Sequence, residues 1–111
     1  MSASKFIDVA AVDEIPEGQG RAFEVDGRIV AVFRLKEGCY AIEDACPHMG
    51  ASLAPGAVEN CVVACPWHAW RFDVRDGAWV ENRRLKIDAF DVKVEAGRVW
   101  VSSNKKDIGD E

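Results

Sequence analysis

The chain has 111 residues and a formal net charge of −5 at pH 7, with the composition of an ordinary globular protein. This length suits one domain with a modest core. The negative charge argues against a general nucleic-acid or anionic-membrane surface, although it suits docking on a basic patch of a partner protein. No apolar run approaches the roughly 18 residues of a membrane span. The first residues lack the apolar centre of a signal peptide, so we expect a cytoplasmic protein.

Short β-rich runs separated by turn signals open the chain. A first strand is predicted over residues 5–10, and a hairpin is predicted from residues 21–25 and 28–35, which flank Asp26-Gly27. That dipeptide favours a tight turn, because glycine accepts the positive φ that the turn needs. A further glycine-containing turn leads into a strand over residues 39–42. No useful helical periodicity appears, so this part is predicted to be a β-meander.

The same pattern returns after the centre of the chain. Two runs, at residues 72–74 and 78–80, flank a turn. Residues 90–95 alternate apolar and polar side chains, as in a half-buried strand, and residues 98–101 form the last predicted strand. The tail from Ser102 is polar and is expected to fray. Short strands at near-regular spacing predict an all-β fold, a small antiparallel β sandwich or barrel.

Residues 44–77 lack the alternating sequence pattern of the strands on either side. They contain a loop of small residues over 49–56, followed by a hairpin that is predicted to turn at Glu59-Asn60. We therefore expect a single domain over residues 1–111, in which a loop-bearing subdomain is inserted into a β base. The base comprises residues 5–43 and 78–102, the inserted subdomain residues 44–77, and the polar tail residues 103–111.

Two cysteine–histidine pairs stand out in the inserted stretch, and each has a proline directly after its cysteine. The pairs are Cys46 with His48 and Cys65 with His68. Two such loops supply two thiolates and two imidazoles, which zinc and iron–sulfur centres accept as ligands. The other cysteines, Cys39 and Cys61, lie in apolar segments with no histidine beside them. We expect core thiols there, because a reducing compartment argues against disulfides.

The two pairs and their surroundings resemble the signature of the Rieske iron–sulfur family. The resemblance covers nearly the whole chain except the tail. The matching residues are Cys46-Pro47-His48-Met49-Gly50, Leu53, Gly56, Cys65-Pro66-Trp67-His68, Trp70-Arg71-Phe72-Asp73 and Gly77. The resemblance implies one Rieske-type [2Fe-2S] cluster, with Cys46 and Cys65 on one iron and His48 and His68 on the other. Imidazoles in place of two thiolates raise the potential relative to an all-cysteine cluster.

The resemblance also indicates which kind of Rieske protein this is. High-potential members carry an additional cysteine in each loop, joined as a disulfide, where this chain has Ala51 and Trp67. Those members also aim a serine and a tyrosine hydroxyl at cluster sulfurs, where Trp70 and Phe72 cannot donate an O–H. Fewer hydrogen bonds to the sulfurs leave the reduced state less stabilised. We therefore predict a potential at the low end of the Rieske range.

Two residues depart from the family pattern. Ala69 stands where a glycine usually follows the second histidine, and Arg83 stands where a proline is common. If position 69 needs a left-handed backbone, alanine costs about 1–2 kcal/mol there. Neither departure removes a ligand, so they bear on fine geometry rather than on the presence of the cluster.

The histidine count limits what the chain does. It has only two histidines, and the implied cluster uses both. A mononuclear non-haem iron centre needs two histidines and a carboxylate of its own, so we expect no oxygenase catalysis on this chain. The chain also lacks the Gly-x-Gly-x-x-Gly segment that is typical of a dinucleotide site, so we expect no such site. The resemblance implies a one-electron carrier, not itself an enzyme, between a flavin-dependent reductase and a terminal oxygenase such as a dioxygenase.

Two alternatives stay open from the sequence. The first is a Rieske-type small subunit of an assimilatory NAD(P)H nitrite reductase, bound to the large subunit of that enzyme. The second is a structural zinc-binding interaction module with the same four ligands. Zinc fingers usually pair cysteine with cysteine and histidine with histidine, whereas each loop here carries one of each.

Overall fold

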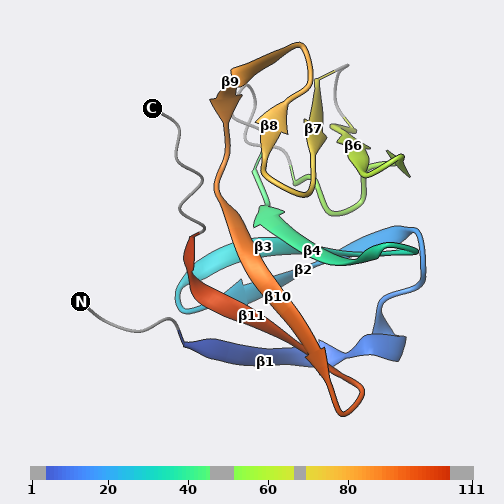
Figure 1. Cartoon of the computed structure of the whole chain (residues 1–111), viewed down its shortest axis with the longest axis vertical. Helices are drawn as coiled ribbons and strands as arrows, with labels where there is room; N and C mark the ends of the chain where they lie inside the picture. Colours follow the sequence, from blue (N-terminus) through green and yellow to red (C-terminus); the bar gives the residue numbers. More distant parts are fainter. Residues whose placement is uncertain (1–4, 46–51, 67–69, 106–111) are drawn as a thin grey trace.

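The computed structural model describes residues 5–45, 52–66 and 70–105, which form two antiparallel β-sheets (Figure 1). The larger sheet has six strands in the order β1-β11-β10-β4-β3-β2. They are β1 (Phe6–Ala11), β2 (Gln19–Val25), β3 (Arg28–Leu35), β4 (Gly38–Glu43), β10 (Ala89–Glu95) and β11 (Arg98–Lys105). Its edge strands β1 and β2 contact each other, so this sheet is nearly closed into a barrel.

The smaller sheet has five short strands in the order β5-β6-β7-β8-β9 and lies at one end of the barrel (Figure 1). They are β5 (Val58–Glu59), β6 (Val62–Ala64), β7 (Arg71–Asp73), β8 (Ala78–Trp79) and β9 (Asn82–Lys86). The expected all-β class and the barrel-like base are confirmed. Across the described ranges the single helical element is a 3-10 turn (Val12–Glu14), and no helix there has the length and apolar character to cross a membrane.

Tight two-residue turns close several hairpins. Asp26-Gly27 turns β2 into β3 with φ values of 52° and 85°, as predicted. The β5–β6 turn lies at Asn60-Cys61, with φ values of 54° and 63°, one residue later than predicted. Two successive positive φ angles give the twist that a two-residue hairpin needs, and asparagine tolerates that conformation well. Cys61 is therefore a turn residue, and its side chain is buried as expected.

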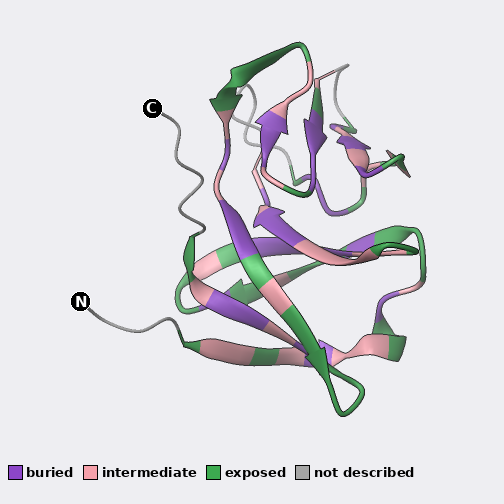
Figure 2. Cartoon of the chain, in the orientation of Figure 1, coloured by how far each residue is buried: buried purple, intermediate pink, exposed green. Residues whose placement is uncertain are grey.

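Strand β3 is buried on both faces. Val30 and Val32 face the interior of the barrel, whereas Ala31 and Phe33 face the core beneath the smaller sheet, and all four are fully buried. This alternation follows from the two-residue period of a strand. Figure 2 shows buried residues in both sheets and where the sheets meet, whereas β9 is mostly exposed. β3 thus contributes side chains to two hydrophobic cores, one on each of its faces.

The chain leaves the larger sheet at Glu43 and returns to it at Asp88, and the two crossing points are joined. The Glu43 N–H donates to the Asp88 carbonyl oxygen at 2.8 Å, and the Asp88 N–H donates to Glu43 Oε1 at 3.4 Å. Arg28 Nη2 lies 2.7 Å from Asp88 Oδ2 and 3.9 Å from Glu43 Oε1. These contacts tie together the two chain segments that connect the smaller sheet to the barrel, in addition to the core that the two sheets share.

Two strand assignments differ from the sequence prediction. No strand was predicted over β9, whose polar and basic run lacks an alternating pattern. The tail was expected to fray from Ser102, yet β11 continues to Lys105 because the Ser103 N–H donates to the Lys5 carbonyl oxygen at 2.8 Å. β8 and β9 pair within the smaller sheet, although the sequence grouped residues from 78 onward with the base. The division into base, inserted subdomain and tail stays a prediction.

Candidate metal centre

Of the four predicted ligands, one lies in the described part of the chain. Cys65 directly follows β6 and is 3% exposed. Cys46, His48 and His68 lie outside the described residues, as do Met49, Ala51, Trp67 and Ala69. The structure therefore shows how the two ligand loops begin and end, which decides where their ligands can reach.

Asp44 joins the two ends of the first loop. Its Oδ1 accepts hydrogen bonds from the N–H groups of Leu53 and Ala54 at 2.9 and 2.8 Å, and its Oδ2 accepts one from Ser52 Oγ at 2.6 Å. Its own N–H donates to the Ile29 carbonyl oxygen at 3.1 Å, which ties the loop to β3. The carboxylate is buried and well supplied with donors. Sequence reasoning missed Asp44, because its partners follow eight to ten residues later.

The second loop is closed by the hairpin that carries it. Val63 pairs with Phe72 and Ala64 with Arg71 across β6 and β7. One step further, the Cys65 N–H donates to the Trp70 carbonyl oxygen at 2.8 Å. Cys65 and Trp70 are therefore the two fixed ends of a short loop that includes the predicted ligand His68. Cys65 is therefore held at the end of a hydrogen-bonded hairpin.

A close backbone approach brings the two loops together. Gly56 lies against β6, where an added Cβ would overlap the carbonyl oxygen of Ala64. The neighbouring Ala57 carbonyl oxygen accepts a hydrogen bond from the Ala64 N–H at 2.9 Å. Ala64 directly precedes Cys65, and Leu53, at the end of the first loop, belongs to the same buried cluster as Cys65. Glycine at position 56 thus lets the end of the first loop lie close to the start of the second.

Three aromatic rings pack beside the second loop. The rings of Trp70 and Trp79 are stacked, with centroids 4.2 Å apart and an interplanar angle of 15°. Phe72 is fully buried, and its ring centroid lies 6.3 Å from that of Trp70. Trp70 and Phe72 thus pack in the core beside the ends of the second loop. Rings of this size exclude water from the neighbouring loop and offer no hydroxyl donor.

A buried carboxylate organises the turn after β7. Asp73 accepts hydrogen bonds from Arg75 Nε at 2.9 Å and Arg75 Nη2 at 2.7 Å. Burial disfavours the ionised form of Asp73, but the hydrogen bonds from Arg75 and the charges of Arg75 and Arg83 outweigh this and lower its pKa. Arg83 Nη2 donates to Asp76 Oδ2 at 2.8 Å and reaches Asp73 Oδ2 at 3.5 Å. Arg83 therefore ties β9 to this turn, at the position where the family commonly has a proline.

The other two cysteines have properties that disfavour metal binding. Cys61 is buried and Cys39 is half-buried, and neither is in a disulfide. Burial raises the pKa of the Cys61 thiol, and the Glu37 carboxylate raises it further. Burial also raises the pKa of the Cys39 thiol, against the charge of Arg34. Because the thiolate is the metal-binding form, both are poor ligands. Within the described ranges no group of three metal-binding side chains offers a competing site.

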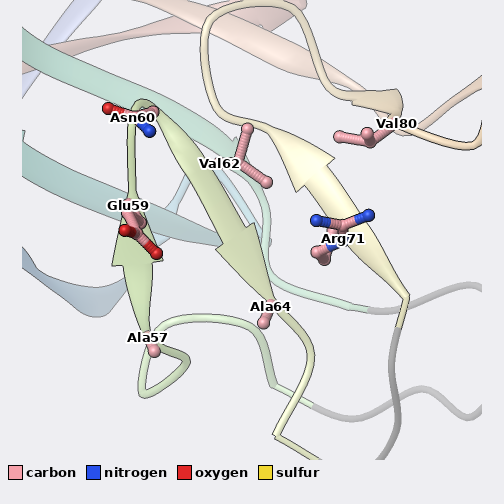
Figure 3. Close-up of a pocket in the computed structure, with 7 residues that line it drawn as sticks. All are labelled: Ala57, Glu59, Asn60, Val62, Ala64, Arg71 and Val80. Carbon is pink, nitrogen blue, oxygen red and sulfur yellow. The ribbon is translucent and has the colours of Figure 1, made fainter.

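A shallow hollow lies on the face of the smaller sheet (Figure 3). It is lined by Ala57, Glu59, Asn60, Val62, Ala64, Arg71 and Val80. Arg71 at its edge pairs with Glu81 at 3.2 Å, and both side chains are about half exposed. The lining mixes small apolar and charged side chains and has no set of metal ligands, so the hollow is not a second metal site.

The described geometry suits a metal centre shared by two loops. The first loop has ends joined by Asp44, the second begins at a buried cysteine, and Gly56 allows the end of the first loop to lie close to that cysteine. A donor set of two thiolates and two imidazoles fits an iron–sulfur centre that exchanges single electrons. Fold and site together define a small all-β iron–sulfur domain.

Comparison with known proteins agrees with this class. The model of the Rieske [2Fe-2S] domain matches residues 5–91. The ferredoxin component of the naphthalene 1,2-dioxygenase system of Pseudomonas aeruginosa is 35% identical over 98 residues, covering 87% of this chain and 94% of the relative. The chain belongs to the Rieske [2Fe-2S] domain family, and its cofactor is a Rieske-type [2Fe-2S] cluster.

Two solved structures extend the comparison. A chain in the complex of reduced oxygenase and oxidized ferredoxin of carbazole 1,9a-dioxygenase is 32% identical, with a TM-score of 0.81 and coverage of 91% of this chain and 95% of that one. A putative NADH-dependent nitrite reductase small subunit from Mycobacterium tuberculosis is 26% identical, with a TM-score of 0.84 and coverage of 91% and 96%. The structural likeness therefore spans the barrel and the smaller sheet.

Proposed function

We propose that this chain is a one-electron carrier that passes electrons from a flavin-dependent reductase to a terminal oxygenase in the cytoplasm. The observation that carries the proposal is the near full-length match to the ferredoxin component of a naphthalene dioxygenase system. The match to a chain in a solved oxygenase–ferredoxin complex supports an oxygenase as the electron acceptor. The chain itself is not the enzyme, because the substrate chemistry takes place on the acceptor.

We assign Cys46 and Cys65 to one iron of the cluster and His48 and His68 to the other. The buried position of Cys65 at the end of β6 supports its part in this assignment. The close approach of the end of the first loop to the start of the second at Gly56 also supports it, because one cluster needs ligands from both loops. Two neutral imidazoles on one iron keep the potential above that of an all-cysteine cluster.

The chain's own residues would prepare this site before any partner arrives. Asp44 and the Cys65–Trp70 hydrogen bond fix the loop ends, so little reorganisation is needed around the bound group. Phe72 and Trp70 exclude water on the core side of the second loop. Such an arrangement suits transfer of a single electron to a docked protein.

A second candidate function is the small subunit of a nitrite reductase. It is favoured by the similarity to the Mycobacterium tuberculosis structure, which covers 96% of that chain. In this reading the chain stays bound to a large subunit instead of shuttling between partners. The two readings share the fold and the cluster, so only the partner separates them.

The test begins with the purified holoprotein under anaerobic conditions. Dithionite titration is expected to consume one electron per cluster and to produce a rhombic low-temperature EPR signal. Reduced protein is then mixed in a stopped-flow instrument with the oxidised terminal oxygenase of a naphthalene dioxygenase system. Rapid oxidation that slows as salt is added would support a shuttle. No oxidation by the oxygenase, together with a stable complex with a nitrite reductase large subunit, would overturn it in favour of the second candidate. Zinc in place of iron would overturn both.

A further inference from the structure

Trp79 is a large side chain whose place in the fold links it to the second loop. It lies in β8 and pairs with Phe72 of β7, the strand that leaves the loop. Its indole is stacked on that of Trp70, with centroids 4.2 Å apart and planes within 15° of parallel. Trp70 is the residue at which the loop rejoins the hairpin. Trp79 therefore packs against the end of the loop without belonging to it.

Trp70 transmits this contact to the loop through its backbone. Its carbonyl oxygen accepts the hydrogen bond from the Cys65 N–H at 2.8 Å. A shift of the Trp70 backbone, which its stacked ring helps to prevent, would alter this closing hydrogen bond and the backbone of Cys65. By the assignment proposed above, the segment between the two residues also holds the ligand His68. The Trp70–Trp79 stack is thus positioned to fix two of the four ligands.

Trp79 is itself held on two sides. The preceding residue, Ala78, is fully buried, and the Val80 N–H that follows donates to the Arg71 carbonyl oxygen at 2.9 Å. The indole Nε1 of Trp79 is buried and has no hydrogen-bond partner among the described residues. Within that part of the chain, ring packing rather than hydrogen bonding holds the indole. A phenyl ring, which has no N–H group, should therefore be able to take the place of the Trp79 indole.

We propose that Trp79 is a positioning residue for the second ligand loop, which it holds through the indole of Trp70. This proposal rests on the cluster assignment in the proposed function. It predicts that loss of the ring loosens the Cys65–Trp70 loop, admits water to the cluster and broadens the range of ligand geometries. Reduction adds one negative charge, which water stabilises, so the midpoint potential should rise.

The test compares Trp79→Leu with Trp79→Phe in the holoprotein. Leucine keeps apolar volume without a stack, and phenylalanine keeps a stacking ring without the N–H group. The matched control is Trp100→Leu in β11 of the larger sheet. Trp100 is also partly exposed, and its buried Nε1 also has no partner among the described residues. The readouts are the EPR line width, the midpoint potential, the rate of iron loss to a chelator and the thermal unfolding midpoint.

We expect Trp79→Leu to broaden the EPR lines, to raise the midpoint potential and to speed iron loss about two- to tenfold, in line with the contribution of an aromatic pair. In Trp79→Phe, the EPR line width, the midpoint potential and the rate of iron loss should stay near the wild-type values. Trp100→Leu should lower only the unfolding midpoint.

Wild-type line width, potential and iron loss in Trp79→Leu would overturn the positioning role and leave the proposed function intact. Equal changes in Trp100→Leu would also overturn it, because they would show a general loss of stability. If the wild-type holoprotein gave no Rieske-type EPR signal, the proposed function would fail first.

Discussion

Replacing Asp44 by alanine tests the anchoring of the first loop. The substitution leaves the buried N–H groups of Leu53 and Ala54 without their acceptor. These residues are 0% and 5% exposed, so water cannot readily take the place of the carboxylate. Each unsatisfied buried donor costs about 1–3 kcal/mol, which gives a loss of about 2–6 kcal/mol. The Ser52 hydroxyl is exposed and can turn to water, so it adds little.

Asp44→Asn provides the graded comparison. It keeps an oxygen that can accept from both N–H groups, and it loses the strengthening that a charge gives to those bonds, about 1 kcal/mol. At this chain length about 4 °C or more of unfolding temperature corresponds to each kcal/mol. We expect the thermal midpoint of the holoprotein to fall by roughly 8 °C or more for Asp44→Ala and by roughly 4 °C for Asp44→Asn, with less iron bound in the alanine variant.

The control is Asp8→Ala, which removes a carboxylate from an exposed ion pair with Arg98. Such pairs contribute little, so we expect almost no change in midpoint or iron content. An Asp44→Ala protein with the midpoint and iron content of Asp8→Ala would refute the reasoning that Asp44 fixes the loop ends.

Four further predictions concern the same end of the molecule. The lowered pKa of Asp73 means that its contribution to stability is complete above its ordinary value of 3.8 and is lost as the pH falls below it. The stability difference between wild type and Asp73→Asn should therefore be constant above about pH 5 and shrink below about pH 4, as measured by urea unfolding across pH. A difference that instead grew on acidification would contradict this. Gly56→Ala forces a Cβ onto the Ala64 carbonyl and should destabilise the holoprotein by about 1–3 kcal/mol with loss of iron; an unchanged unfolding midpoint would argue against the close approach. Cys65→Ala should lose the cluster while Cys39→Ala retains it, as judged by iron per chain and EPR, and an intact signal in the Cys65 variant would remove that residue from the ligand set. Because indole and phenyl rings stand where high-potential members have hydroxyl donors, a potentiometric titration should give a midpoint near the lower limit of the Rieske range, about −150 mV, and a strongly positive value would contradict the prediction.

The barrel strands were predictable because their signals are local. The run over residues 28–35 matches β3 without adjustment, and Asp26-Gly27 forms the predicted turn. The four proposed metal ligands were also chosen from a local pattern, since each short loop holds one cysteine and one histidine. Hydrophobic periodicity and turn chemistry act over a few residues, which is the range over which sequence patterns can be interpreted.

The features that position the site depend on contacts between distant segments. Asp44 acts on residues at the far end of its loop, and Trp79 acts on Trp70 across two strands. β9 has no periodic pattern and forms because it extends a sheet that already exists. From the sequence, Arg83 was identified only as a departure from the family pattern. The structure shows that its side chain forms an ion pair with Asp76. None of these pairings has a local signal, so a single sequence could not predict them.

The double burial of β3 has a consequence for how the protein matures. The barrel interior consists of Ile15, Val25, Val30, Val32, Ala41, Phe90, Val99 and Val101, and none of these residues comes from the ligand loops or the smaller sheet. This core can therefore form before any iron is bound. The opposite face of β3 is then already in place for the ligand loops to pack against. In hydrogen exchange of the apoprotein, the β3 amides should stay protected while those of β5 to β7 exchange quickly. Cluster insertion would then be the final local step of folding rather than its starting point.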